Sequence, residues 1–210
     1  MTTKDSPTGV IRSRREILKT GAVVGGLSVA GVTSAQANGA TRETVDVVGQ
    51  GTGGPVVAED GATLRRTDNA LQAKIKMPTP EPGEYDYPDP DENPTAAPPG
   101  HPEGFTLWMF VFDEEQGGYD PDDPDEGPFP WSSVFFVAGH MVGGPNLTLS
   151  GNAATAHESM GFDLENPRDV DVHLAVAPHG GLDPDIMPEQ IQTPAGGPDM
   201  WWFAIFEAPE

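Results

Sequence analysis

The chain has no cysteine among its 210 residues, and this absence excludes several kinds of site. Without thiols there are no disulfides, no lipid-modified N-terminal cysteine and no blue-copper centre, which needs a cysteine beside two histidines. The stability of the fold must therefore come from its core.

Long hydrophobic runs are missing as well. After residue 37 no apolar run exceeds ten residues, whereas a membrane-spanning helix needs about 20. We therefore expect no transmembrane segment in the mature chain.

The first residues of the chain have the organisation of an export signal. Arg14 and Arg15 lie in the segment SRREILK, which is similar to the motif that the twin-arginine translocase reads. A Gly- and Ala-rich stretch follows and ends in an Ala-Gln-Ala cleavage pattern at Ala37. The sequence predicts a signal peptide over residues 1–37 and a mature domain over 38–210, located outside the cell or in the cell envelope. The translocase is the partner expected during export.

Basic residues are scarce. The chain has 33 acidic and 11 basic residues, and residues 1–37 contain two of the acidic and five of the basic ones. The mature chain therefore keeps 31 acidic and six basic residues, a net charge of −25. Such a field disfavours nucleic acid and anionic membranes as partners. Because apolar, aromatic-rich segments are also present, we expect a folded acidic protein rather than a disordered one.

The composition and the export signal together are similar to those of a known group of proteins. The acidic excess, the scarcity of lysine and the twin-arginine signal together resemble the exported proteins of halophilic archaea. The resemblance implies adaptation to high salt, so that the net charge reflects the solvent rather than a ligand.

Short apolar segments separated by glycine and proline predict strands. Residues 103–113 are apolar at both even and odd positions, which favours a central strand covered on both faces. Residues 71–77 alternate apolar and polar, which predicts a half-buried strand. Further strands are expected at 44–48, in a hairpin over 55–67 that turns at 59–61, at 131–142 in a hairpin with 146–150, at 169–177 and at 200–207.

Two segments predict long loops. Residues 78–102 hold nine prolines in 25 residues, and residues 114–130 are rich in acidic residues. Residues 183–192 could form one or two helical turns, with Asp183 as cap. The sequence therefore predicts an all-β chain, a single antiparallel β-sandwich with at most one short helix.

A second resemblance rests on four segments, LWMFVFD, AGHMVGG, DVHLAVAPHGG and PEQIQTP. Together they resemble a group of secreted bacterial and archaeal proteins without an assigned activity, over the span from Ala62 onward. This resemblance implies a location and a β-rich fold, and it transfers no catalytic residue.

Three histidines are the candidate metal ligands. His140, His173 and His179 lie on or beside predicted strands, and imidazole suits both Zn and Cu. No compact H-x-H or H-E-x-x-H signature is present. The alternative is that these side chains cap glycine turns or lie on a polar face.

Aromatic residues predict a second layer on the outer face of the sheet. Trp108, Phe110 and Phe112 share one face of the predicted central strand, and we expect Trp202 and Phe206 to join them. Such a layer is either buried or exposed to a protein, a carbohydrate or a second subunit. Burial is favoured, because large exposed apolar patches are rare on monomers.

The segment Asn146-Leu147-Thr148 is an N-glycosylation sequon. Asn146 is therefore a candidate site for a glycan. The leading hypothesis is a secreted or envelope-associated, non-enzymatic module adapted to high salt, with a protein or glycan partner and no required cofactor. The rival is a metal-binding protein or metal-dependent enzyme that uses the three histidines.

Overall fold

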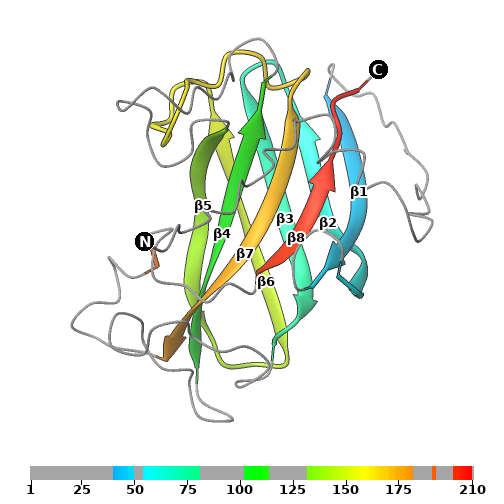
Figure 1. The fold of residues 1–210 in the computed structure, drawn as a ribbon, viewed down its shortest axis with the longest axis vertical. Helices are drawn as coiled ribbons and strands as arrows, with labels where there is room; N and C mark the ends of the chain where they lie inside the picture. The colour runs from blue at the N-terminus through cyan, green and yellow to red at the C-terminus, as the bar shows by residue number, and fades with distance from the viewer. Residues whose placement is uncertain are drawn as a thin grey trace, which may run out of the picture.

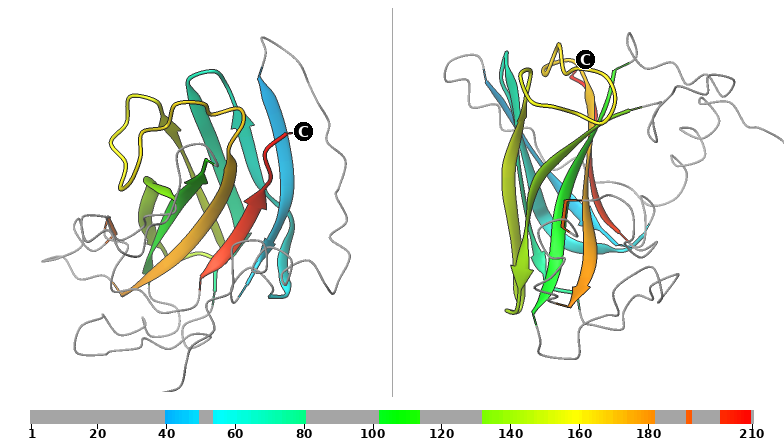
Figure 2. Two further views of the ribbon diagram at one scale, coloured as in Figure 1. Left: turned by 45° about the horizontal axis from the view of Figure 1, so that its top comes forward. Right: turned by 90° about the vertical axis from the view of Figure 1, so that its left-hand side faces the viewer.

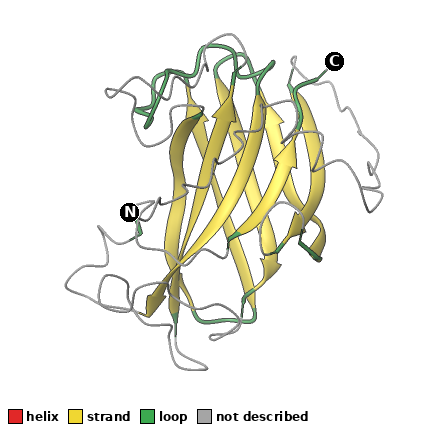
Figure 3. Cartoon of the chain, viewed as in Figure 1, coloured by secondary structure: helices red, strands yellow, loops and turns green. Residues whose placement is uncertain are grey.

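In the computed structural model the described residues are 40–49, 54–80, 102–113, 132–181, 191–192 and 201–209. Within these ranges the chain forms strands and no helix (Figure 3), and therefore no helix of the length and apolarity that crossing a membrane requires. The strands, labelled in Figure 1, are β1 (Thr41–Val48), β2 (Val56–Arg66), β3 (Ala70–Pro78), β4 (Glu103–Phe112), β5 (Ser133–Val142), β6 (Asn146–Ala154), β7 (Asp171–Gly181) and β8 (Trp202–Phe206).

The eight strands form one antiparallel sheet in the order β5-β4-β7-β8-β1-β2-β3-β6. The sheet curls until its two edge strands meet (Figure 2). At Gly151 of β6 a Cβ atom would collide with the carbonyl oxygen of Val137 in β5, so glycine is what permits this approach. The all-β antiparallel prediction is confirmed. A sandwich of two separate sheets is not confirmed, because the single sheet is nearly barrel-shaped.

The sheet has one weak seam. β1 and β8 share a single registered pair, Val48 with Phe203. The seam divides the sheet into a β4 half (β5-β4-β7-β8) and a β3 half (β1-β2-β3-β6). Within each half the strands pair over longer registers; β3 and β6, for example, pair continuously from Ala70 to Pro78.

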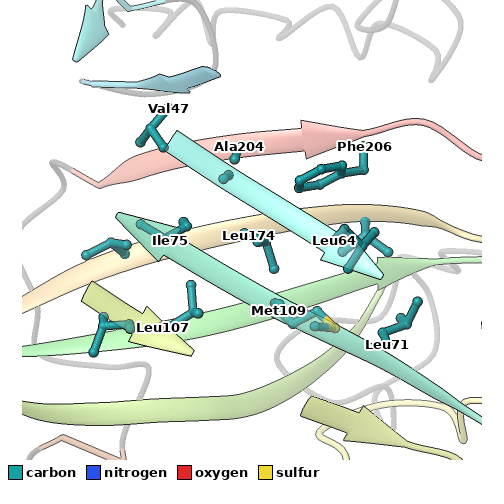
Figure 4. Packing of buried hydrophobic residues seen from close by; sticks show 14 of the residues in the cluster. Val47, Leu64, Leu71, Ile75, Leu107, Met109, Leu174, Ala204 and Phe206 are labelled. Atoms are coloured by element: carbon teal, nitrogen blue, oxygen red, sulfur yellow. The ribbon is translucent and has the colours of Figure 1, made fainter. Parts of the chain in front are cut away.

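The core lies between the two halves, because alternate side chains of each half point inward. On β3 the buried residues alternate with exposed ones, as the sequence predicts. Leu64 and Ile75 of the β3 half pack with Leu107, Met109 and Leu174 of the β4 half (Figure 4). The two halves therefore share one hydrophobic core, and their outer faces point in opposite directions.

The predicted central strand is confirmed. β4 pairs with β5 on one side and with β7 on the other. Phe105, Leu107 and Met109 face the core, while Trp108 belongs to a separate cluster on the outer face. A strand with apolar residues on both faces is thus buried on both faces.

The predicted turn at 59–61 is wrong, because β2 continues through it. Asp60 takes a positive φ of 48°, and its amide donates to the Asp46 carboxylate at 2.8 Å. The register between β1 and β2 shifts here, so the chain forms an irregularity within the ladder instead of reversing. Gly61 is required at this point, because a Cβ would lie only 2.7 Å from the Cβ of Ala58.

The predicted hairpin of 131–142 with 146–150 is also wrong in its pairing. Both strands exist, but β6 pairs with β3 and not with β5. The short turn between them carries the chain from the β4 half to the β3 half. Most of the two long loops (78–102 and 114–130) and most of the expected helical turns at 183–192 lie outside the described residues.

Arg66 joins the two halves at the end of the seam where backbone pairing is missing. Its side chain is fully buried, and its Nε donates to Glu43 at 2.8 Å. One terminal nitrogen, Nη1, donates to the carbonyl of Val170, just before β7, at 2.6 Å and to that of Pro167 at 3.4 Å. The other, Nη2, donates to the carbonyl of Glu207, just after β8, at 3.2 Å. One guanidinium thus ties β2 to the ends of two strands of the other half.

Replacing Arg66 by methionine is expected to lower the free energy of unfolding by about 3–5 kcal/mol, because it leaves a partly buried carboxylate and three carbonyls without their donor. Denaturant unfolding in high salt measures the loss. Arg168→Met is the control: the Arg168–Asp68 pair is exposed, with 29% and 79% of the side-chain surfaces accessible, and its loss should cost less than about 1 kcal/mol. Equal losses in the two variants would contradict the role of Arg66.

Candidate functional site

The structure does not bring the three candidate histidines together. His173 and His179 lie on the same strand, β7, and six residues of strand span about 20 Å. His140 pairs in register with Phe105 and points to the opposite face of the sheet from Gly104, against which His179 packs. Among the described residues no three His, Asp or Glu side chains are grouped so that they could hold a metal ion. The metal hypothesis therefore gains no geometric support.

Burial lowers the pKa of two of these histidines, His173 and His179. His179 is 2% exposed, and burial lowers its pKa to about 4. His173 packs against Phe112, with ring centroids 4.6 Å apart. Burial lowers the pKa of His173 as well, and the charge of Asp171 opposes that effect. Both imidazoles are neutral at neutral pH, as side chains packed into apolar surroundings should be.

Lowering the pH should destabilise the fold through His179. Its pKa is about 4 in the folded chain against an ordinary 6.5, so the unfolded chain binds the extra proton first. The contribution of the neutral His179 to the free energy of unfolding is complete above pH 6.5. It falls by roughly 1–3 kcal/mol as the pH drops to 4. Denaturant unfolding across this window should show a smaller fall for His179→Gln than for the wild type. Identical pH profiles would contradict this assignment.

The outer face of the β4 half carries an aromatic layer. Trp108 is fully buried and meets Phe136 edge-on at 5.7 Å, while Phe136 is 41% exposed. Trp201 stacks on Phe203 with ring centroids 6.4 Å apart, and its ring centroid lies 6.2 Å from that of Phe110. The Trp108 side chain is therefore shielded from solvent, whereas the aromatic side chains around it are only partly buried.

The membership of this layer differs from the prediction on β8. Trp202 and Phe206 point into the main core, where Trp202 meets Phe105 at 6.5 Å. Trp201 and Phe203 occupy the outer face instead. The β7 register places Phe203 beside Ala175, and so fixes which residues of β8 point outward.

The segment 191–192 lies on the same outer face, next to this layer. The Thr106 hydroxyl donates to the Ile191 carbonyl at 2.6 Å. Gly139 leaves room for Ile191, because a Cβ there would lie 3.3 Å from the Cβ of Ile191. Burial, the favoured alternative for Trp108, is what the structure shows.

Trp108→Ala should cost about 3–5 kcal/mol of unfolding free energy, the usual range for a buried large aromatic side chain. Phe136→Ala, at a partly exposed position that packs on one edge of Trp108, should cost less, about 1–2 kcal/mol. Trp108→Phe should recover most of the loss, since the indole Nε1 is buried without a hydrogen-bond partner among the described residues. Denaturant unfolding compares the three, and a loss below about 1 kcal/mol for Trp108→Ala would contradict its role in packing.

None of the protein-family models, curated proteins or solved structures matches this chain. The location of a site therefore rests on the geometry and charge of the chain itself.

The outer face of the β3 half is polar, and it carries most of the basic residues that follow residue 37. Six basic residues follow residue 37, and four of them, Arg42, Arg65, Lys74 and Lys76, occupy outward positions on β1, β2 and β3. Arg42, Lys74 and Lys76 are exposed, and Arg65 is half-buried. We call these four residues and their neutral neighbours the basic face. The neutral neighbours are Thr44, Thr63, Gln72, Thr148, Ser150 and Asn152.

The strand registers set the order of side chains across the basic face. Arg42 lies directly opposite Arg65, and Arg65 lies opposite Gln72, whose side-chain oxygen accepts from it at 2.9 Å. Lys74 lies between Thr63 on β2 and Ser150 on β6. Arg65, Lys74 and Lys76 thus each have a neutral polar group as a cross-strand neighbour, and Arg42 and Arg65 are adjacent.

These four cations lack acidic partners within the described part of the chain. The ion pairs there join the two remaining basic residues, Arg66 and Arg168, to Glu43 and Asp68. Like charges directly opposite each other on neighbouring strands are destabilising, so the unneutralised Arg42–Arg65 pair favours an anion from outside the chain. The outward lysines could be read from the alternation of residues 71–77, but their alignment with Arg42 and Arg65 depends on registers that the sequence does not reveal.

Asn146 lies exposed at the start of β6, with Thr148 exposed two residues later. The sequon is therefore accessible on the same side as the basic face. Glycosylation of Asn146 stays a prediction.

Proposed function

We propose that this chain is an exported, non-enzymatic binding module adapted to high salt, and that it docks an anionic partner on the basic face. The observation that carries the proposal is the concentration of charge. Four of the six basic residues of a mature chain of net charge −25 occupy one exposed sheet face. Solvated lysines are common on protein surfaces, but two facing arginines without an acidic partner are costly.

The export part of the proposal rests on Arg14, Arg15 and Ala37, which lie outside the described residues. Their pattern supports passage through the twin-arginine translocase and a final location outside the cell or in its envelope. The acidic excess of the sequence after residue 37 supports adaptation to salt. Its resemblance to halophilic proteins points the same way.

High salt also reconciles an anionic partner with a strongly acidic chain. At about 1 M salt the screening length is roughly 3 Å, so the repulsion from distant carboxylates is largely removed. An anion in contact with the basic face then interacts mainly with its immediate neighbours. Those neighbours are cations and neutral donors, except at the end of the face beyond Thr44, where the Asp46 carboxylate accepts from the Asp60 amide.

Binding to carboxymethyl-dextran in 1 M KCl tests the proposal, with unmodified dextran as the reference polymer. The wild type should bind the charged polymer, and Lys74→Gln/Lys76→Gln should weaken binding at least about fivefold, because two exposed ion pairs are lost. The control Arg168→Gln removes one positive charge that is not part of the basic face and is already paired with Asp68, so it should leave binding unchanged. No binding by the wild type, or an equal loss in the control, would overturn the proposed function.

A further inference from the structure

We infer that the partner of the basic face is an acidic polysaccharide, a polymer that carries both carboxylates and hydroxyls on its sugar units. This inference rests on the proposed function, and it names the class of partner. It is carried by the arrangement of neutral side chains around the cations. A face that carried cations alone would bind any polyanion.

The basic face alternates cations with hydroxyl and amide groups. Lys74 is flanked by Thr63 and Ser150 in register, Lys76 by Thr148, and Arg65 by Gln72. Neighbouring strands lie about 4.8 Å apart, and alternate residues on one strand about 7 Å apart. A cation and a neutral hydrogen-bonding group therefore recur within the span of one sugar unit. A uronic acid presents a carboxylate and free hydroxyls on that same scale.

An acidic polypeptide fits the basic face less well. Peptides commonly bind to sheets by adding a strand to a free edge, whereas β1, β2 and β3 pair on both sides and the edge of β6 lies against β5 where the sheet closes. Protein interfaces are enriched in aromatic residues and Met and depleted in Lys and Ser. The basic face carries no aromatic side chain or Met among its outward positions. The same absence removes the stacking platform that single-stranded nucleic acid uses.

The salt of the proposed environment also favours a partner with hydroxyls. Purely ionic contacts between exposed groups weaken as salt rises. Hydrogen bonds between neutral groups are not screened in this way, so Thr63, Ser150 and Gln72 keep their contribution. A partner that uses both kinds of contact stays bound where a purely ionic one is released.

The experiment compares two polyanions of matched length, sodium polygalacturonate and sodium polyglutamate, by titration calorimetry in 1 M and 3 M KCl. The variants are Lys74→Gln/Lys76→Gln, which removes charge, and Thr63→Val/Ser150→Ala, which removes hydroxyls and leaves the sequon at Asn146 intact. Thermal unfolding of each variant confirms that it is folded.

Polygalacturonate should bind the wild type at both salt concentrations. The lysine variant should weaken that binding at least about fivefold, and the hydroxyl variant should weaken it about threefold or more. Polyglutamate should bind more weakly and should not respond to the hydroxyl variant.

Two other outcomes are distinguishable. If polyglutamate binds as tightly as polygalacturonate and the hydroxyl variant changes neither, the polysaccharide inference is overturned while docking on the basic face stands. If neither polymer binds, or the lysine variant binds both as the wild type does, the proposed function falls together with the inference.

Discussion

The buried guanidinium of Arg66 is the interaction on which the closed form of the sheet depends. β1 and β8 share only one registered pair, so the backbone does little to hold the two halves together along the seam. Arg66 supplies donors to Glu43, Val170 and Glu207 across this region. Because its charge is paired and its nitrogens are bonded, the burial of the cation is compensated. A chain without disulfides thus closes its sheet with one arginine and a shared apolar core.

Closing the sheet gives the molecule two unlike outer faces. The outer face of the β4 half is aromatic, with Trp108 fully buried and the aromatic side chains around it half-buried or exposed. The outer face of the β3 half is polar and carries Arg42, Arg65, Lys74 and Lys76 without acidic partners among the described residues. An antiparallel sheet with one wet face is ordinary. The concentration of cations on the exposed face of so acidic a chain is the observation that supports the proposed binding role of this face.

Local patterns predicted the strands, and long-range pairing decided the rest. The alternation in residues 71–77 and the apolar run of 103–113 identify β3 and β4 and their buried faces. The turn at 59–61 was wrong because Asp-Gly is read as a hairpin signal, whereas here it is absorbed within a continuing ladder. The sequence does not reveal which of the adjacent Trp201 and Trp202 points inward. The prediction therefore put Trp202 on the outer face, whereas the structure puts Trp201 there. The basic face depends on three strand registers, and registers are set by pairing between distant segments.

The central claim is that the shared core and the buried Arg66 together make the two halves one cooperative body. Native-state hydrogen exchange on the wild-type chain tests it most directly, by comparing the opening free energies of the slowest amides of β3 with those of β7. The account predicts that both strands open with the same free energy, equal to that of global unfolding. Two separate levels, more than about 2 kcal/mol apart, would show that the halves unfold independently and would contradict it.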